Sequence, residues 1–580
     1  MFLTLIAIAV LAGGPPPLET LWVTDYNGPA DGQDFAERVF PDDAGNLYVI
    51  GGSAQTGSPT DLMAAKFAPD GSTLWFRTLA LSTSGGYHYA YAGAIDDDGN
   101  LYSTGTYYLG PAGTTIPILK YDAAGDLLWS REYWFSSGGN SSNQASDLVV
   151  GTDGAVYVCG MTSAHPTPGD MVLLKYDADG TLLWTRHYNG AFNGWDRGRR
   201  LAIDADGNII VLGESQVGAV DDDIVIWKYA PNGDLIWQQF LGHPAGRADF
   251  SNAMRIGPDQ SIYLAGYARV DPDPDSEDDD AFIARFDTNG ALEWQTWYGH
   301  ASLRSDKYFA LVVDPAGNAY ATGVTEIGFD DDFVVTRVDA TGRSAWTRQF
   351  GEVFEETDQG DAIDLDEQGN VLVGGESVRL LDGAAGGDGG KDPPIEYGFR
   401  FLSYTPDGDL RYESFQSLGD ERSLQDARAL PGGEIVAVGN FHTDATDQDF
   451  YVARWLETFD CNGNGLPDEQ DIDRGTSQDC NGNGTPDECD IAAGTALDCN
   501  GNGVPDACDI DAGILHDDDA SGVADECEAI GDLDGDGSVG ATDLAILLGG
   551  WGSCRNCPAD LDGDGAIGPA DLAILLGNWG

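Results

Sequence analysis

Basic residues are scarce in this sequence. Its 580 residues include 29 Lys and Arg against 97 Asp and Glu, a formal net charge of -68 at pH 7. Residues 457–580 contain only two basic residues, Arg474 and Arg555. A surface of this sign repels phosphate backbones and anionic membranes and attracts divalent cations. We therefore expect no nucleic-acid partner, and calcium is the first metal to consider.

Long apolar runs are also missing. No internal segment reaches the roughly 18 apolar residues that a membrane-spanning helix needs, so we expect no membrane insertion. The start, MFLTLIAIAVLAGGPPP, has a shorter apolar run from Phe2 to Ala12, followed by small residues and prolines. This pattern is typical of a signal peptide, which we place at residues 1–14. We predict a secreted, soluble mature chain that is extracellular or associated with the cell surface.

Cysteine and histidine are too few in the first 456 residues to indicate a metal or catalytic site there. Cys159, in AVYVCGMT, is the only cysteine of this part and is predicted to be a small core residue. The other eight lie between Cys461 and Cys557, where export would favour disulfides. The seven His are scattered, and their order supports no Ser-His-Asp arrangement. No catalytic residue and no organic cofactor is predicted.

Glycine and tryptophan, by contrast, are abundant. The 79 Gly and 14 Trp, in a chain that is 42% hydrophobic, indicate a turn-rich β protein. The segment LAIDADGNIIVLGES…DDDIVIWKYAPNGDLIWQQFLG, residues 201–242, is one unit of a long repeat. Each unit has four short runs of alternating polarity separated by Gly, Asp and Asn turns. Four strands per repeat is the signature of one propeller blade.

One apolar strand with a large aromatic residue recurs in each unit, mostly at intervals of 52 to 57 residues, and so gives the number of units. Its anchors are Trp22, Trp75, Trp129, Trp184, Trp237, Trp294, Trp346 and, in the eighth place, Tyr412. The chain enters on a lone Trp strand and leaves the repeats after a third strand, so the first strand can complete the last blade and remove an exposed edge. We predict a mainly β fold with an eight-bladed propeller over residues 15–456, and seven blades as the alternative.

The units resemble the bacterial propeller repeats called seven-bladed β-propeller (SBBP-type) repeats. The stretch KYDADGTLLW is similar to the Trp-docking repeat of eight-bladed quinoproteins. The resemblance covers about residues 20–456 and implies the fold, with Trp wedged between neighbouring blades, but it specifies no function. Quinone-cofactor enzymes of that group carry an adjacent Cys-Cys pair, which this sequence lacks.

The repeat also predicts which face of the propeller varies. If the Trp strand is outermost, the tight turns share one face and the longer connections share the other. Those connections carry VDPDPDSEDDD (270–280), GAVDDDI, GFDDDF and LLDGAAGGDGGKDPP (380–394). Function on repeat scaffolds usually lies where loops vary, so we expect a protein or glycan ligand on this face. The alternative is that acidic loop tips only keep the protein soluble.

A different repeat, with a period of nineteen residues, begins at Asp460, Asp479, Asp498 and Asp517. Oxygen-bearing side chains fall at positions 1, 3, 5, 9 and 12, the ligand spacing of an EF-hand loop, and hard oxygen ligands suit Ca²⁺. The cysteines stand nine or ten positions apart, which disfavours zinc. The predicted ligands are Asp460, Asn462, Asn464, Asp468 and Asp471; Asp479, Asn481, Asn483, Asp487 and Asp490; Asp498, Asn500, Asn502, Asp506 and Asp509; and Asp517, Asp519, Asp525 and Glu528.

This pattern resembles thrombospondin type 3 repeats over residues 460–528, within a predicted domain at 457–529. Two disulfide patterns use all six cysteines. The early Cys of one unit can pair with the late Cys of the next, as 461–489, 480–508 and 499–527, or a sequential ladder can form, as 461–480, 489–499 and 508–527. The first is preferred because it preserves the repeat.

Two nearly identical units end the chain, GDLDGDGSVGATDLAILLGGWG and ADLDGDGAIGPADLAILLGNWG. Each reads as a calcium loop followed by a short helix, in a domain at 530–580. The predicted ligands are Asp532, Asp534, Asp536, Ser538 and Asp543, then Asp560, Asp562, Asp564, Ala566 and Asp571, with Ser538 and Ala566 donating backbone carbonyls.

This duplicated F-hand resembles type I dockerin, which implies a cohesin-like partner. The resemblance places recognition at loop positions 10 and 11, here Ala541-Thr542 and Pro569-Ala570. These pairs differ from the Ser/Thr types of cellulosomal dockerins, which argues against a cellulosomal partner. Leucines of both helices are expected to form the core and the partner-facing surface. Trp551 and Trp579 are expected to pack, and Cys554 and Cys557 to form a local disulfide.

Together these segments predict a secreted, calcium-binding modular protein. Its propeller would bind a ligand, and its dockerin would anchor it to a scaffold or cell surface. We favour a non-catalytic role. The alternative is a glycan-active enzyme, a glycoside hydrolase or polysaccharide lyase, because dockerins often accompany polysaccharide degradation.

Overall fold

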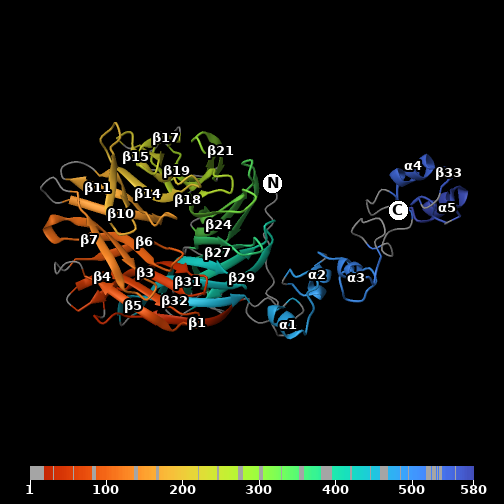
Figure 1. Ribbon diagram of the computed structural model, residues 1–580, viewed down its shortest axis with the longest axis horizontal. Helices are drawn as coiled ribbons and strands as arrows, with labels where there is room; N and C mark the ends of the chain where they lie inside the picture. The colour runs from red at the N-terminus through yellow and green to blue at the C-terminus, as the bar shows by residue number, and fades with distance from the viewer. Residues whose placement is uncertain are drawn as a thin grey trace, which may run out of the picture. The chain divides into compact units, whose positions relative to one another are not determined.

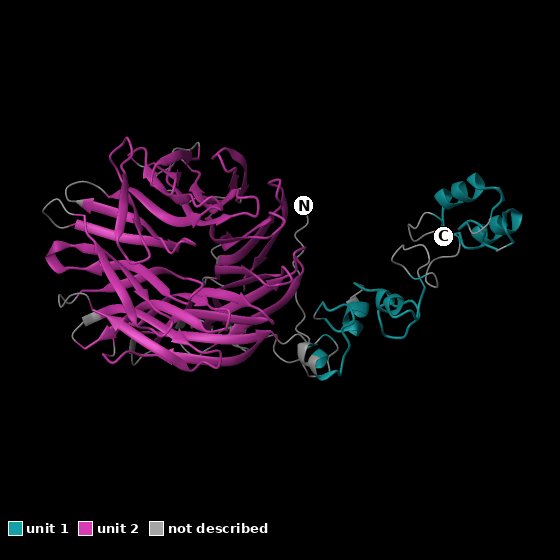
Figure 2. Ribbon diagram, in the orientation of Figure 1, with its two compact units in different colours: residues 1–16, 458–580 teal, residues 17–457 magenta. Residues whose placement is uncertain are grey.

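The computed structural model describes residues 18–579 except 31, 57, 81–85, 136–140, 165–168, 220, 244–246, 272–277, 300–304, 328–329, 352–357, 381–394, 418–420, 444–445, 458–460, 462–467, 484, 494, 517–523, 525–530, 532, 534–538, 555–556 and 563. The chain forms two compact units, residues 17–457 and residues 458–580 with 1–16 (Figure 2). The predicted signal peptide lies outside the described residues.

The larger unit is an eight-bladed β-propeller (Figure 1). Its described strands form eight four-stranded antiparallel sheets, each with neighbouring strands adjacent in sequence except at one seam. The first four blades contain β2 (Phe35–Pro41), β3 (Leu47–Gln55), β4 (Ser58–Phe67) and β5 (Thr73–Leu79); β6 (His88–Ile95), β7 (Leu101–Tyr108), β8 (Thr114–Tyr121) and β9 (Leu127–Tyr133); β10 (Ser141–Val150), β11 (Val156–Ala164), β12 (Asp170–Tyr176) and β13 (Leu182–Tyr188); and β14 (Asp196–Ile203), β15 (Ile209–Gln216), β16 (Asp222–Tyr229) and β17 (Leu235–Leu241).

The other four blades complete the ring. They contain β18 (Asp249–Ile256), β19 (Ile262–Arg269), β20 (Asp279–Phe286) and β21 (Leu292–Tyr298); β22 (Asp306–Val313), β23 (Ala319–Ile327), β24 (Asp330–Val338) and β25 (Ser344–Phe350); β26 (Gln359–Leu365), β27 (Val371–Leu380), β28 (Ile395–Tyr404) and β29 (Leu410–Gln416); and β30 (Glu421–Leu430), β31 (Glu434–Thr443), β32 (Thr446–Glu457) and β1 (Leu18–Tyr26). A 3-10 turn, Gly110–Ala112, precedes β8.

The DADGN-type turns explain why the blades are so regular. In the fourth blade the Asp204 carboxylate accepts the backbone N–H of Asp206 at 3.0 Å and of Asn208 at 2.8 Å, which closes the turn from β14 to β15. Gly207 has a φ of 78°, a left-handed conformation that glycine adopts without a steric cost. The same residue types in the other blades therefore produce the same tight hairpin.

Each core cluster of the propeller lies between two blades. Ile210 and Leu212 of β15, for example, pack in one cluster with Leu264 of β19 and Phe282 of β20. Middle strands are covered on both faces by neighbouring blades, so they are buried at nearly every position, as in β15. Cys159 is fully buried and free, as the sequence predicted.

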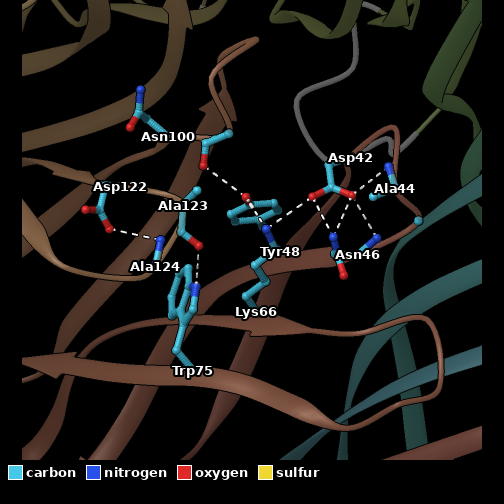
Figure 3. Close-up of polar contacts among 12 residues, drawn as sticks. Asp42, Ala44, Asn46, Tyr48, Lys66, Trp75, Asn100, Asp122, Ala123 and Ala124 are labelled. Carbon is cyan, nitrogen blue, oxygen red and sulfur yellow. Dashed lines mark hydrogen bonds and ion pairs between the residues drawn. The ribbon is translucent and has the colours of Figure 1, made fainter.

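The repeated tryptophans dock each blade onto the next. Trp75 Nε1 donates to the carbonyl of Ala123 at 3.1 Å (Figure 3), in the β8–β9 turn of the following blade. Gly125 of that turn has a φ of 81°, and a Cβ there would stand 2.6 Å from the indole. Six further Trp donate in the same way, namely Trp22, Trp129, Trp184, Trp237, Trp294 and Trp346. The predicted position of Trp between blades is confirmed.

The first strand closes the ring. β1 pairs antiparallel with β32, from Leu18 opposite Glu457 to Tyr26 opposite Phe450. Because these two strands are not joined by a turn, the eighth aromatic has no turn carbonyl to dock on. Tyr412 instead donates its hydroxyl to the Glu457 carboxylate at 2.6 Å. The eight-bladed prediction is confirmed, and the seven-bladed alternative is wrong.

The smaller unit contains short helices between loops. They are α1 (Asp468–Arg474), α2 (Asp487–Ala493), α3 (Asp506–Asp511), α4 (Ala541–Gly549) and α5 (Pro569–Gly577), with the paired strands β33 (Gly552–Ser553) and β34 (Ala566–Ile567). A small core at the C-terminal end includes the fully buried Leu547 and Leu575. None of the described helices has the length and apolar character that crossing a membrane requires.

Candidate functional site

The innermost strand of every blade carries a β-bulge. In β2 the pairing register shifts between Ala36 and Arg38, and the other seven inner strands shift at the equivalent place. A bulge leaves one residue out of the ladder and re-aims its side chain. The bulged residues are Glu37, Tyr91, Ser146, Arg199, Asn252, Phe309, Asp361 and Gln425.

These bulges surround a polar cavity of about 250 Å³ on the propeller axis. Its walls combine residues of all eight inner strands, including six of the eight bulged residues. We call this space the central cavity. Sequence reasoning missed it, because the eight bulged residues share no chemistry that a repeat alignment would reveal.

A row of stacked tyrosines leads into the central cavity along β6. The rings of Tyr87 and Tyr89 lie 6.2 Å apart at 11°, and those of Tyr89 and Tyr91 lie 5.7 Å apart at 13°. Tyr87 is 50% exposed, whereas Tyr91 lines the cavity. Burial raises the pKa of Tyr91 to about 12, so its hydroxyl stays neutral. The tyrosine row thus runs from solvent to the cavity wall.

A pair of carboxyl groups lies in the seventh blade. Asp361 lines the central cavity, and its Oδ1 accepts a hydrogen bond from Gln359 Nε2 at 3.0 Å. Burial, and then the charge of Glu376, raise the pKa of Asp361 well above its usual range. Burial alone raises the pKa of Glu376. Raised pKa values favour the protonated, neutral form of both groups, and general acid catalysis requires a group that carries a proton.

One of the loops predicted to carry an exposed acidic tip contains a buried carboxylate, that of Asp279. Its carboxylate is 1% exposed and forms ion pairs with Arg269 at 3.2 Å and Lys307 at 3.3 Å. The group Asp278, Asp279 and Asp280 is therefore not a free acidic tip, because its middle member holds two blades together. Residues 272–277 of the same loop, and residues 328–329 and 381–394 of other variable loops, lie outside the described residues.

A second cavity, of about 370 Å³, lies between the first two blades on the tight-turn face. Its polar side chains bond to one another, since Lys66 Nζ donates to Tyr48 at 2.6 Å and pairs with Asp42 at 3.2 Å (Figure 3). Asn46 donates to the same Asp42 carboxylate, and Tyr48 to the carbonyl of Gly99. These contacts support blade docking, so we favour the central cavity as the ligand site.

In the described calcium-type loops the Asn side chains converge on the carboxylate at position 12 through their amide N–H groups. In the second unit Asn481 and Asn483 each reach Asp490 Oδ2 at 2.9 Å, which brings positions 3, 5 and 12 together. The third unit repeats this, with Asn500 and Asn502 at 2.7 Å from Asp509 Oδ2. Asp479 and Asp498, at position 1, accept backbone N–H groups of their own loops. A flip of each amide, which exchanges its N–H group for its oxygen atom, would direct the oxygen atoms to the same centre.

Position 9 has a different environment. Asp487 Oδ1 accepts the backbone N–H of Cys480 at 2.9 Å, and Asp468 and Asp506 do the same for Cys461 and Cys499. These carboxylates therefore close their loops through the backbone of position 2. In the first unit Asp471, at position 12, is also buried.

The last loop gathers three carboxylates. Ligand oxygens of Asp560, Asp562 and Asp564 lie within 4.8 Å of one another. Asp571, at position 12, accepts the backbone N–H groups of Asp562 and Gly568. Asp543 of the preceding loop likewise accepts from Leu533 at 2.7 Å and Gly540 at 2.6 Å. Ala566 lies in β34, where its N–H donates to Asp564. This donor set fits a hard divalent cation.

Several predicted ligands lie outside the described residues. They are Asp460, Asn462, Asn464, Asp517, Asp519, Asp525, Glu528, Asp532, Asp534, Asp536 and Ser538.

The disulfides follow the repeat-preserving pattern. Cys461 bonds to Cys489, and Cys480 to Cys508. This excludes the sequential ladder. Cys499 is also disulfide-bonded, while its predicted partner Cys527 lies outside the described residues. The local Cys554–Cys557 disulfide is present as predicted.

The two C-terminal helices present equivalent surfaces. Ala541, Thr542, Pro569 and Ala570, the predicted recognition positions, are all exposed. Leu548 and Leu576 are 50% and 52% exposed, and each directly follows a buried leucine, Leu547 or Leu575. Trp551 and Trp579 are exposed as well, so the prediction that they pack is wrong. Each Trp follows the C-cap residue of its helix, Gly550 or Asn578, so neither Trp lies on a helix face.

Comparison with known proteins assigns no family. No family model and no curated protein matches the chain. Sqt1 from Chaetomium thermophilum has a TM-score of 0.44 and 10% identity, over 76% of this chain and 100% of that one. The polysaccharide lyase Uly1 has 0.39 and 11%, over 63% and 89%, and a puromycin hydrolase has 0.40 and 13%, over 71% and 59%. These values give no basis for transferring an activity.

Proposed function

We propose that this protein is secreted, binds a glycan in the central cavity of its propeller, and is anchored through its C-terminal module. The tyrosine row Tyr87, Tyr89 and Tyr91 carries the binding proposal. Sugar rings present apolar C–H faces, which pack on exposed aromatic rings, while their hydroxyls need polar partners. Ser146, Asn252 and Gln425 would supply such partners in the cavity wall. A protein ligand is the other outcome that a binding experiment could give.

Export is supported by the disulfides of the smaller unit, because such bonds form in oxidising compartments. The apolar start of the sequence agrees with this. Calcium binding is supported by the Asn and Asp side chains that converge in the second and third repeats, and by the clustered carboxylate oxygens of the Asp560 loop. The ion would neutralise carboxylates that otherwise repel one another.

Anchoring to a cohesin-like domain is supported by the duplicated loop-helix units. Both present small exposed residues at loop positions 10 and 11, beside exposed leucine and tryptophan side chains. A paired apolar surface of this kind is typical of a protein interface. The thrombospondin type 3-like repeats would then act as a spacer between anchor and propeller.

A glycan-active hydrolase or lyase is the second candidate. It is favoured by the Asp361 and Glu376 carboxyl groups, whose raised pKa values suit one proton donor and one acceptor. Release of new reducing or unsaturated ends from a polysaccharide, lost in Asp361→Asn and Glu376→Gln, would identify the enzyme. Binding without product release supports the non-catalytic function that we favour.

Replacing Tyr87 with Ala is expected to weaken glycan binding on the order of tenfold, because a stacked and half-exposed ring contributes about 1.5 kcal/mol when a ligand covers it. A glycan array followed by calorimetry on the best glycan measures this. Leu183→Ala is the matched control, since Leu183 is 52% exposed on the outer strand β13. Equal affinity of the Tyr87 and Leu183 variants would contradict the assigned site.

Docking is expected to need both terminal loops. Replacing Asp532 and Asp560 with Ala removes the first ligand from each loop and should abolish calcium-dependent capture by a cohesin domain, measured by surface plasmon resonance. Glycan binding by the same variant should be unchanged. Capture that persists in this double variant would show that the module is not a calcium-dependent dockerin.

A further inference from the structure

Four arginines line the central cavity, although basic residues are rare in this chain. Arg38, Arg200, Arg255 and Arg428 come from β2, β14, β18 and β30 of four different blades. They lie close enough for their charges to act on one another. Besides burial, the charge of Arg38 lowers the pKa of Arg200, and the charges of Arg428 and Arg200 lower the pKa of Arg255. Like charges held together by a rigid ring need a compensating group.

The carboxylates of the same walls supply only part of that compensation. Asp147 accepts the backbone N–H of Leu201 at 2.7 Å, and Asp426 that of Val39 at 3.2 Å. Both bonds cross from one blade to the next, so these carboxylates serve the blade seams. Among the four arginines and the described residues, only Arg428 has a carboxylate partner within ion-pair distance, Asp426 at 2.8 Å.

Most N–H donors of the Arg200 and Arg255 guanidinium groups therefore have no acceptor among the described residues. Arg200 Nη1 donates to the carbonyl of Arg199 at 3.1 Å, and Arg255 Nη1 to that of Met254 at 2.9 Å. Each guanidinium carries five N–H donors, and the described residues offer no other acceptor. Arg255 is exposed to the cavity space. Surrounding protein lowers its pKa by desolvation, yet an arginine keeps its charge.

The seventh blade contributes further carboxyl groups, and one of them, Asp364, faces Arg428 and Arg255 while it accepts the backbone N–H of Ala429 in the next blade at 3.2 Å. Asp361, with its neighbour Glu376, is the carboxyl group that lines the wall of the seventh blade. Burial raises the pKa of both carboxyl groups, and the charge of Glu376 raises that of Asp361 further, so their charged forms are disfavoured. The cavity thus has arginines on the first, fourth, fifth and eighth blades and, on the seventh blade, a carboxyl group whose charged form burial disfavours.

We propose that the central cavity binds the oxyanion group of an acidic glycan, a carboxylate or a sulfate, through Arg200 and Arg255. The glycan part of this statement rests on the proposed function, whereas the oxyanion part rests on the arginines. Guanidinium groups pair with planar or tetrahedral oxyanions through two parallel N–H bonds. The tyrosine row would hold the adjacent sugar rings, with Tyr91 beside the charged group.

The test compares the full-length protein with the double variant Arg200→Gln/Arg255→Gln. Calorimetry uses three oligosaccharide probes, namely oligogalacturonate, sulfated dextran oligomers and neutral dextran oligomers. The wild type should bind at least one anionic probe and not the neutral one, and the double variant should lose at least about tenfold in affinity for it, as expected for lost charge-assisted bonds. Arg343→Gln, an exposed arginine of the β24–β25 turn, is the matched control.

Inorganic sulfate separates this inference from the glycan function. At constant ionic strength, sulfate in place of chloride should raise the propeller's melting temperature more in the wild type and in Arg343→Gln than in the double variant. That result without glycan binding would support the oxyanion site and overturn the glycan function. Neutral dextran bound equally by wild type and double variant would support the glycan function and overturn the oxyanion site. Equal sulfate shifts in all three proteins, with anionic probes bound equally, would also overturn it.

Discussion

Removing calcium is expected to unfold residues 458–580 while the propeller stays folded. Carboxylate oxygens of Asp560, Asp562 and Asp564 lie within 4.8 Å of one another, and each pair of charges at such a distance repels by about 1 kcal/mol even in water. Apart from its disulfides and the small core around Leu547 and Leu575, little in the described part of this unit opposes that repulsion, because its helices have six to nine residues and isolated helices of that length are marginal. Binding free energy would therefore supply much of the folding free energy.

Hydrogen exchange on the full-length chain measures both units at once. After chelation, amides of α2, α3, α4 and α5 should lose protection, whereas those of the middle strands, such as β15, should keep it. Adding calcium back should restore protection, since the disulfides Cys461–Cys489 and Cys480–Cys508 keep the repeats in register. If the amide protection of α4 and α5 were the same with and without chelator, the calcium assignment would be refuted.

The propeller and its blade count could be predicted because the signals are local and repeated. A DADGN turn needs only its own glycine and aspartate, and a docking Trp recurs once per blade, so periodicity alone identifies the unit. The same holds for the loops near Asn481 and Asp490, whose contacts lie within one repeat. Ring closure followed from counting strands at the two ends of the chain.

The central cavity could not be predicted, because it exists only when eight blades meet. Tyr91 and Arg255 lie far apart in the sequence and have no motif in common, yet both line the same space. The bulge that re-aims Tyr91 also has no sequence marker. Asp279 shows the opposite error, since an acidic run suggested an exposed tip but the fold buries its carboxylate between two basic side chains.

Deleting β1, residues 18–26, is expected to abolish cooperative folding of the propeller. The strand supplies the pairing partner of β32 along its length, so its loss exposes the edge of β32. It also removes the Trp22 bond to the carbonyl of Pro69 at 2.8 Å, and the stacking of Tyr26 on Phe76 at 4.4 Å and Phe450 at 4.9 Å. Trp22→Ala alone should cost about 3 kcal/mol, a large share of the roughly 5 to 15 kcal/mol that stabilises a typical domain.

Two matched variants separate the role of the strand from general damage. Tyr412→Phe removes only the hydroxyl bond to Glu457 at the same seam and should cost about 1 kcal/mol. In a circularly permuted chain, residues 18–26 follow Glu457 through a short glycine turn and the smaller unit is omitted. Because Leu18 lies opposite Glu457, the strand can return to its place as an ordinary hairpin, and folding should recover. Denaturant unfolding monitored by tryptophan fluorescence, with sedimentation to detect aggregation, measures the β1 deletion, both point variants and the permuted chain. A chain without β1 that still unfolds in one transition at the wild-type midpoint would show that the ring does not depend on its closing strand.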